Sequence, residues 1–419
     1  MPHRTVGGWL AALLAAAGCT TLPSLPLLTP PRGAGLDVAR DGTLRKDGKP
    51  FRGIGVNYFD LFYRSLRDPS ASLRAGPADA GCHEGLAELA RRGIPFARFM
   101  ACGFWPNDWK LYFEDKPAYF ALLDNMVKAA EEHGIGLIPS LFWASATVPD
   151  LVGEPRDAWG NPDSKTHAFM RAYTREIVTR YRHSPAIWGW EFGNEYNLDA
   201  DLPNAAQHRP AVVPKLGTPA ARSARDDLTH DALATALAAF ADEVRKHDPR
   251  RIITSGHSAP RPSAWHQRKE KSWSQDDESQ FAERLLLDHP DPVNVLSIHV
   301  YETSGKRFGR EVSAAEFLAL AMQVAAQAKK PLFVGEFGAS DQAPDGEKGA
   351  KERLAALLAA IEKAEVPLAA LWVYDFRGQD KDWNVTATNA RAWQLDAIAE
   401  ANQRIKARLL ARPAEAGKE

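Results

Sequence analysis

Short apolar segments alternate with longer amphipathic segments eight times along this chain of 419 residues. Such alternation is typical of β-strand and α-helix units that build a parallel sheet. Eight units can close into a barrel, and one barrel with long loops accommodates a chain of this length. We therefore predict an α/β fold, a (β/α)8 TIM barrel over residues 36–410. The predicted strands are residues 51–57, 96–101, 135–143, 186–195, 251–257, 293–301, 331–337 and 366–376.

The segments between these strands have helical periodicity. In residues 118–133, for example, Phe120, Leu123, Val127 and Ala130 fall on one stripe. The other predicted helices are residues 79–92, 166–182, 229–247, 280–289, 314–329, 347–363 and 389–410. Before the first strand, residues 37–50 contain two Asp-Gly turns with alternation between them, which predicts a short β-hairpin that plugs the bottom of the barrel.

The N-terminus has the pattern of an export signal. Arg4 supplies a positive charge, and the apolar run from Trp9 to Ala17 is too short to span a bilayer. The run ends in Ala16-Ala17-Gly18-Cys19, which resembles a bacterial lipoprotein signal in which Cys19 becomes the lipid-bearing residue. Ala16 stands where leucine is usual, so cleavage by an ordinary signal peptidase stays open. Residues 1–19 are thus predicted as the signal, 20–35 as a linker and 411–419 as a disordered tail.

Composition excludes some classes of partner. The net charge of −1 gives no electrostatic basis for binding nucleic acid or an anionic membrane surface. No His/Cys cluster has metal-ligand spacing, and no Gly-rich phosphate loop is present, so neither metal nor cofactor is expected. The 12 Trp and 18 Phe are unusual, and those in predicted loops could stack on sugar rings. We expect an exported monomer that contacts a membrane only through a lipid anchor.

Two predicted strands end in a glutamate. Residues 186–195 end in Asn194-Glu195, and residues 331–337 contain Glu336 near their end. A single glutamate at a strand end is more often a helix cap or a solvated loop residue. Two on a barrel lie on the same face, because the carboxyl ends of all eight strands meet there. Retaining glycoside hydrolysis needs two carboxyl groups about 5–5.5 Å apart.

Five motifs in order along the strands resemble the clan A retaining glycoside hydrolases, most closely family 5, the cellulase and mannanase family. Asn194-Glu195 is similar to the acid/base motif, and Gly335-Glu336-Phe337-Gly338 to the nucleophile motif. The other matches are Arg98 on the second strand, His299-Val300-Tyr301 on the sixth and Trp372 on the eighth. The resemblance covers the chain from about residue 37 to the last predicted helix.

The resemblance implies a role for each carboxyl group. Glu336 attacks the anomeric carbon as a carboxylate, and Arg98 and Tyr301 are expected to hydrogen-bond it. Glu195 protonates the leaving oxygen and then activates water. The alternative for Arg98 is a purely structural ion pair with Glu191, which has the same strand parity as Glu195 and should point inward one layer down.

The remaining site candidates are expected to bind sugar or position the carboxyl groups. His299 is expected beside Glu195, Asn194 on the sugar 2-hydroxyl and Trp372 under the ring of the sugar being cleaved. The alternative for His299 is a hydrogen-bonded histidine of the core, and the alternative for Trp372 is packing in the barrel. Weaker subsite candidates follow the first three strands: Asn57, Tyr58, Phe62, Trp105, Trp109 and Trp143.

Two departures from the family pattern bear on the substrate. Tyr196 stands where family 5 usually has proline, and Phe142-Trp143 stands where a histidine is frequent. The expected substrate is a β-1,4-linked polysaccharide or oligosaccharide, cleaved by an endo-β-mannanase-like or endo-β-glucanase-like enzyme, with mannan slightly favoured over glucan. The alternatives are a transglycosylase and a non-catalytic carbohydrate-binding lipoprotein.

Two further predictions concern the loops. Trp265 and Trp273, in the loop at residues 258–279, are expected either to stack on sugars outside the cleaved bond or to pack. Cys82 and Cys102 are expected to form a disulfide or to be two separately buried thiols. A helix start and a strand end share one face of the barrel, and an exported chain folds in an oxidising compartment. A disulfide requires Cα atoms about 4.4–6.8 Å apart.

Overall fold

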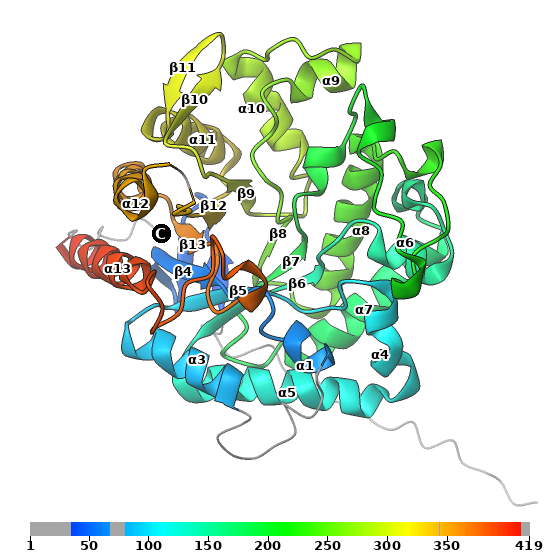
Figure 1. The fold of residues 1–419 in the computed structure, drawn as a ribbon, viewed down its shortest axis with the longest axis horizontal. Helices are drawn as coiled ribbons and strands as arrows, with labels where there is room; N and C mark the ends of the chain where they lie inside the picture. The colour runs from blue at the N-terminus through cyan, green and yellow to red at the C-terminus, as the bar shows by residue number, and fades with distance from the viewer. Residues whose placement is uncertain (1–34, 68–79, 343, 412–419) are drawn as a thin grey trace, which may run out of the picture. The chain divides into compact units, whose positions relative to one another are not determined.

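Eight parallel strands form a barrel at the centre of the computed structural model, which describes residues 35–67, 80–342 and 344–411 (Figure 1). The order of neighbours around the barrel is β8-β7-β6-β5-β4-β13-β12-β9, and a parallel bridge between Thr254 and Val295 joins β8 to β9. All eight predicted strands and the TIM-barrel fold are therefore confirmed. The strands are β4 (Gly53–Asn57), β5 (Phe96–Met100), β6 (Gly136–Phe142), β7 (Gly189–Gly193), β8 (Ile252–Thr254), β9 (Leu296–His299), β12 (Leu332–Phe337) and β13 (Leu368–Leu371).

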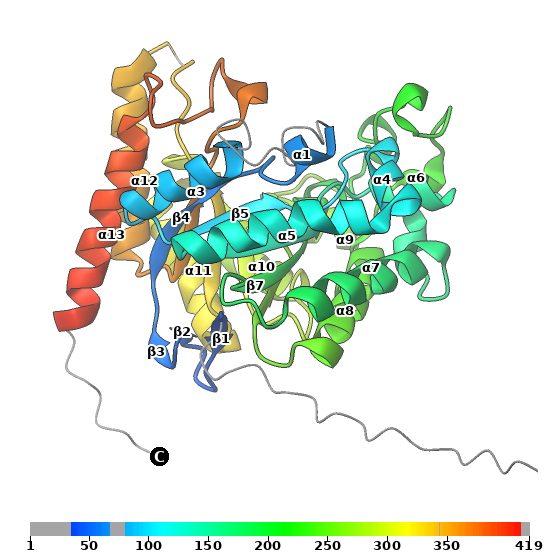
Figure 2. The ribbon, with the colours of Figure 1, turned by 90° about the horizontal axis from the view of Figure 1, so that it is seen from below.

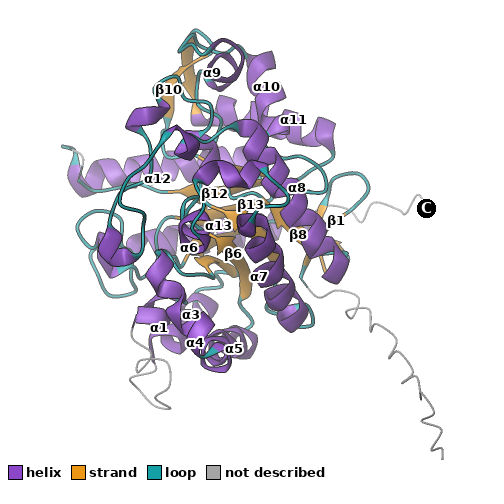
Figure 3. Cartoon of the chain, turned by 90° about the vertical axis from the view of Figure 1, so that its right-hand side faces the viewer, coloured by secondary structure: helices purple, strands orange, loops and turns teal. Residues whose placement is uncertain are grey.

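The predicted helices surround this barrel, as Figure 3 shows by colour. Because helices cover the outer face and side chains fill the inside, every residue of these eight strands is buried. This double burial explains why the strands read as nearly continuous apolar runs. The helices that follow the strands are α3 (Ala80–Arg91), α5 (Lys116–His133), α7 (Lys165–Tyr181), α8 (His230–His247), α10 (Glu278–Leu287), α11 (Ala314–Ala328), α12 (Gly346–Lys363) and α13 (Trp393–Ala411).

The N-terminal hairpin closes the bottom of the barrel, as predicted. Strands β1 (Leu36–Val38), β2 (Leu44–Lys46) and β3 (Lys49–Pro50) form a small antiparallel sheet. Leu36 and Leu44 are buried in one cluster with inward-facing strand residues such as Phe96 and Trp188. Figure 2 shows β1–β3 at one end of the barrel and helix α1 (Tyr63–Arg67) at the other.

The loops at the carboxyl ends of the strands carry structure that the sequence did not predict. After β9, an antiparallel hairpin of β10 (Ser304–Arg307) and β11 (Arg310–Ser313) precedes α11. The two turn residues, Phe308 and Gly309, both have positive φ. Because the first is Phe and not Asn, the sequence lacks the Asn-Gly signal of a tight hairpin. Short helices also occupy the loops: α4 (Lys110–Glu114), α6 (Thr147–Val152), α9 (Ala264–Glu270) and the 3-10 helices η1 (Pro106–Trp109), η2 (Arg156–Gly160), η3 (Tyr196–Asp199), η4 (Ala205–Gln207), η5 (Pro214–Leu216), η6 (Ala224–Asp226) and η7 (Arg377–Gln379).

Some predictions fall on residues that the structure does not describe. The signal at residues 1–19 with Cys19, the linker up to residue 34 and the tail from residue 412 lie outside the described residues. Within the described part of the chain, no helix has the length and apolar character needed to cross a membrane.

Candidate active site

Glu336 lies near the end of strand β12, where two donors hold its carboxylate. Arg98 on β5 donates from Nη1 to Oε1 at 2.9 Å, and the hydroxyl of Tyr301 donates to Oε2 at 2.5 Å. Glu336 is only 4% exposed. Burial beside Glu336 raises the pKa of Tyr301 well above its usual value, so its hydroxyl stays protonated and can donate. Both predicted partners of Glu336 are therefore in place.

Arg98 connects Glu336 to a buried network inside the barrel. Its Nε donates to both oxygens of Glu191, at 2.8 and 2.9 Å, and its Nη2 donates to Oδ1 of Asn194 at 2.7 Å. The guanidinium also lies 4.6 Å from the centre of the Trp143 ring. A buried cation needs such partners, because an unpaired one is costly. The two alternatives for Arg98 are thus not exclusive, since it pairs with both Glu191 and Glu336.

Asn57 supports Arg98 from below and does not line the cleft. Its Oδ1 accepts a hydrogen bond of 2.8 Å from Arg98, and its amide donates to the carbonyls of Gly335 and Ala370 at 2.9 and 3.2 Å. Asn57 is fully buried. The prediction that it contacts sugar is wrong, because the last residue of β4 still points into the barrel interior.

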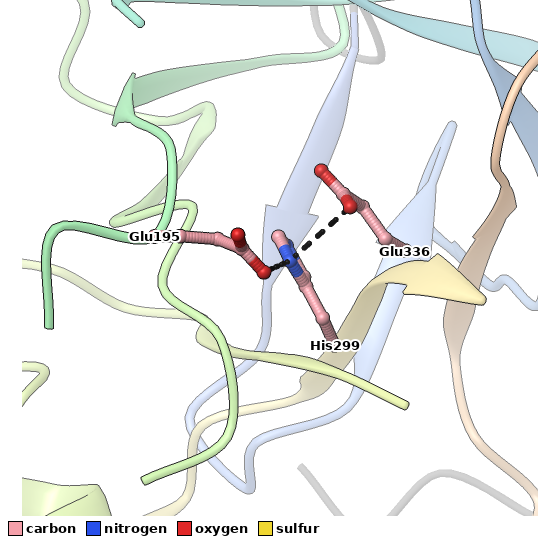
Figure 4. A group of neighbouring side chains, drawn as sticks. All are labelled: Glu195, His299 and Glu336. Atoms are coloured by element: carbon pink, nitrogen blue, oxygen red, sulfur yellow. Dashed lines mark hydrogen bonds and ion pairs between the residues drawn. The ribbon is translucent and has the colours of Figure 1, made fainter. Parts of the chain in front are cut away.

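Glu195 follows strand β7 in an uncommon backbone conformation. Its φ of 55° and ψ of 24° lie in the left-handed region, and its N–H donates to the carbonyl of Gly256 at 2.9 Å. Backbone strain of this kind in a non-glycine residue is concentrated at functional sites. The side chain keeps 32% of its surface exposed and points toward Glu336 (Figure 4).

His299 lies between the two glutamates. Its Nδ1 is 2.8 Å from Oε1 of Glu195 and 3.5 Å from Oε2 of Glu336 (Figure 4). A carboxylate oxygen of Glu195, a carboxylate oxygen of Glu336 and a ring nitrogen of His299 all lie within 4.8 Å of one another. Burial acts to raise the pKa of Glu195, but the hydrogen bond and charge of His299, with a smaller effect of Arg98, lower it below its usual value. The predicted position of His299 beside Glu195 is confirmed.

A cleft of about 620 Å³ opens above these residues and is walled by aromatic side chains. Trp105, Trp143 and Trp372 line it, as predicted. The indole N–H of Trp372 donates to Gln379 at 2.8 Å, which fixes the ring. The sequence did not identify the other aromatic residues of the cleft, although they lie in loops after the first, second and eighth strands: Phe59, Tyr63, Phe104, Phe376 and Trp383.

Five other aromatic candidates lie outside this cleft. Tyr58, Phe62 and Trp109 are at most 1% exposed and belong to the hydrophobic core. The prediction that they form sugar subsites is therefore wrong, and their role is to pack the core. Trp265 donates to Glu283 at 3.0 Å, and Trp273 is 52% exposed. Neither residue lines the cleft that contains the two carboxylates.

The predicted disulfide between Cys82 and Cys102 is absent from the structure. Cys102 is buried, and its Sγ accepts a hydrogen bond of 3.4 Å from the backbone N–H of Trp143. Its side chain is therefore directed toward the end of β6. Cys82 is half-buried on α3 and forms no disulfide with Cys102, so the prediction of a bridge is wrong. Burial raises the pKa of the Cys102 thiol to about 12, which makes it unreactive.

Known proteins resemble this chain in sequence and in fold. Mannan endo-1,4-beta-mannosidase F of Aspergillus clavatus is 37% identical over 79 residues, 17% of this chain and 18% of the relative. A probable mannan endo-1,4-beta-mannosidase C of Aspergillus terreus is 31% identical over 144 residues, 32% of this chain and 30% of the relative. These matches thus span less than a third of the relatives' length.

Solved structures extend the similarity of the fold to most of the chain. The glycoside hydrolase family 5 mannosidase of Rhizomucor miehei superposes with a TM-score of 0.62 at 13% identity, over 90% of this chain and 99% of that one. The endo-1,4-beta-mannanase of the same organism gives 0.61 at 15% identity, over 89% and 99%. A family model described as cellulase (glycosyl hydrolase family 5) matches residues 78–376, more than half of the chain. The protein therefore belongs to glycoside hydrolase family 5.

Proposed function

We propose that the enzyme hydrolyses β-1,4-linked glycans with retention of anomeric configuration, using Glu336 as nucleophile and Glu195 as acid/base. The observation that carries this proposal is the carboxylate separation. Glu195 and Glu336 each place an oxygen within 4.8 Å of the other. Retaining enzymes have carboxyl groups about 5–5.5 Å apart, whereas inverting enzymes need about 6.5–9.5 Å to admit a water molecule.

In the first step, Glu336 attacks the anomeric carbon while Glu195 transfers its proton to the leaving oxygen. The bond to the leaving sugar breaks, and an ester to Glu336 forms. Arg98 and Tyr301 hold the attacking carboxylate in one orientation through both of its oxygens. Arg98 donates to Oδ1 of Asn194. The NH₂ group of Asn194 therefore stays available to donate to the sugar 2-hydroxyl.

Glu195 needs a proton at the start of the cycle and must lose it later. A bound sugar covers the exposed third of its side chain, and burial raises the pKa of a carboxyl group. After the ester forms, the negative charge of Glu336 is gone, while His299 and Arg98 remain and lower the pKa of Glu195. Glu195 then removes a proton from water, which cleaves the ester and restores both carboxyl groups.

Mannan is the substrate that we favour. The matched relatives are named mannan endo-1,4-beta-mannosidases, and an open aromatic cleft suits binding within a chain of sugars. A panel of mannan, cellulose, mixed-linkage glucan and aryl glycosides tests this choice. We expect manno-oligosaccharides from mannan as the main product, and release from cellulose alone would overturn the mannan assignment. Product analysis with an added acceptor sugar separates hydrolysis from transglycosylation.

We also propose that the protein is exported and anchored to a bacterial envelope membrane through Cys19. The support is the sequence pattern at residues 1–19 alone. Metabolic labelling with a radioactive fatty acid in a bacterial host should label the wild-type protein and leave the Cys19→Ser variant unlabelled. Equal labelling of both would exclude Cys19 as the lipidated residue.

A further inference from the structure

A second pocket, of about 310 Å³, adjoins the aromatic cleft and is lined by His299 and Tyr301. Loops after β7, β8 and β9 form it, including Leu198, Ser258 and the β10–β11 hairpin visible in Figure 1. Tyr301 lines both hollows. Since Trp372 and Glu336 belong to the aromatic cleft, the sugar attacked by Glu336 lies there. His299, whose Nδ1 is 2.8 Å from Glu195, lines the second pocket, so a leaving sugar that Glu195 protonates would extend toward that pocket.

The second pocket is positively charged in a protein whose net charge is −1. Its lining residues include the three cations Arg261, Lys306 and Arg307, against the single carboxylate of Glu302. Among the described residues, none of these four side chains makes an ion pair within 4.0 Å, unlike Arg64, Arg222 and Arg391. The pocket therefore presents cationic groups whose charge no neighbouring carboxylate neutralises directly.

Arg307 is the most constrained of these cations. Its Nη1 donates to the carbonyl of Pro260 at 2.9 Å, and its guanidinium lies 4.6 Å from the centre of the Phe317 ring. Burial lowers the pKa of Arg307, against the smaller opposing effects of the Glu302 and Asp276 charges, neither of which forms an ion pair with it. Holding a partly desolvated cation without a carboxylate partner is unfavourable, and a bound anion would offset that cost.

Arg261 is fixed in a similar way. Its Nε donates to the carbonyl of Leu198 at 2.7 Å, and among the described residues its two terminal nitrogens have no hydrogen-bond acceptor. Nε and Nη2 of Arg307 likewise have no acceptor among these residues. Two guanidinium groups that are oriented in advance by backbone carbonyls suit a planar or tetrahedral oxyanion, because the arginine fork matches its geometry.

We propose that this pocket is a leaving-group subsite for an acidic sugar, one that carries a carboxylate or a sulfate ester. The natural substrate would then be a glycan in which acidic residues occur next to the cleaved bond. The inference rests on the proposed function, because it takes Glu195 as the proton donor and so defines the leaving-group side. Neutral mannan or glucan would still bind, but without the contribution of the three cations Arg261, Lys306 and Arg307.

Three disaccharides with the same glycone test the proposal. The glycone is that of whichever aryl glycoside the enzyme cleaves, and the leaving sugar is glucose, glucuronate or glucose 6-sulfate. We expect kcat/KM for an acidic member to exceed that for the neutral one by about tenfold, the factor of one good ionic contact. The two acidic arms distinguish carboxylate from sulfate. Equal or slower cleavage of both acidic members would overturn the inference.

Variants locate the effect. In Arg307→Gln and in Lys306→Gln, the ratio of kcat/KM for the preferred acidic disaccharide over the neutral one should fall toward one. Lys306 is exposed, so its replacement keeps the test informative even if Arg307→Gln fails to fold. Lys269→Gln, an exposed residue of α9 outside the pocket, is the matched control and should keep the full ratio.

The outcome separates this inference from the proposed function. If no aryl glycoside is cleaved, the proposed function fails. If aryl glycosides are cleaved but the acidic preference is absent, or if Lys269→Gln reduces the preference as much as Lys306→Gln, only the acidic subsite fails.

Discussion

Nδ1 of His299 lies 2.8 Å from Oε1 of Glu195, so the carboxyl group that must both give and take a proton is bonded to a titratable ring. The same nitrogen is 3.5 Å from Glu336. His299 thus couples the two carboxyl groups, and its charge is one reason why the pKa of Glu195 is lowered. The contribution of Glu195 to the rate should therefore depend on how strongly the leaving group needs protonation.

Glu195→Ala should slow substrates with poor leaving groups far more than those with good ones. Protonation by a positioned acid contributes about 10²–10⁴-fold, and an activated phenolate leaves without it. The measurement is kcat/KM across aryl glycosides of graded leaving-group acidity, for wild type and variant. An equal loss along the whole series would mean that Glu195 is structural.

Arg98→Met should destabilise the protein as well as inactivate it. The change leaves Glu191 and Glu336 in the barrel without their shared cation, and breaking a buried pair from one side costs about 3–5 kcal/mol. Urea unfolding reports the loss. Arg180→Met is the control, because its partner Asp124 lies at the surface, where a pair contributes less than about 1 kcal/mol. Similar losses in both variants would contradict the network described for Arg98.

Trp383→Ala should weaken oligosaccharide binding by about tenfold, whereas Trp273→Ala should leave it unchanged. Trp383 lines the aromatic cleft and packs edge-on against Tyr301, with ring centres 5.3 Å apart. Trp273 is half exposed and lies outside the cleft. Titration of an inactive variant with manno-oligosaccharides compares the two. A loss confined to Trp273→Ala would show that the loop after β8 contacts substrate.

The barrel could be predicted from the sequence because its strands are buried on both faces, which produces continuous apolar runs. Glu195, Glu336 and His299 could be placed for the same reason, since a polar residue that ends such a run lies on the catalytic face of the barrel. The direction in which a loop side chain points depends on contacts with residues far away in sequence. The sequence therefore leaves stacking and packing open for Trp265, and it does not identify Trp383 as a cleft residue.

Local patterns also failed where one residue decides the outcome. Asn57 is the last residue of a strand, and Glu195 also stands at a strand end. The side chain of Asn57, however, is buried and accepts a hydrogen bond from Arg98 instead of lining the cleft. Sγ of Cys102 accepts a hydrogen bond from the backbone N–H of Trp143 just after β6, a contact that no spacing of cysteines reveals. The cationic pocket depends on a hairpin whose turn, at Phe308 and Gly309, lacks the usual Asn-Gly sequence.

Stability should fall as the pH drops from about 6.5 toward about 4. Burial lowers the pKa of His257 to about 3 and that of His289 to about 4. In this range the unfolded chain binds protons that the folded protein does not, so the free energy of unfolding decreases with acid. Each histidine contributes a slope of at most about 1.4 kcal/mol per pH unit. His257→Gln should reduce the slope measured by urea unfolding. A slope identical to that of the wild type would remove His257 from the explanation.

The central claim is that Glu336 forms a covalent bond to the sugar. A 2-deoxy-2-fluoro glycoside with a good leaving group slows hydrolysis of that bond and traps it. Intact-protein mass spectrometry should show the addition of one fluorosugar, and peptide mapping should place it on Glu336. Glu336→Ala should take up none, although azide should partly restore its turnover of an activated aryl glycoside, giving the inverted product. Wild-type enzyme that turns over the ordinary glycoside but forms its adduct on another residue, or forms no adduct, would contradict the account.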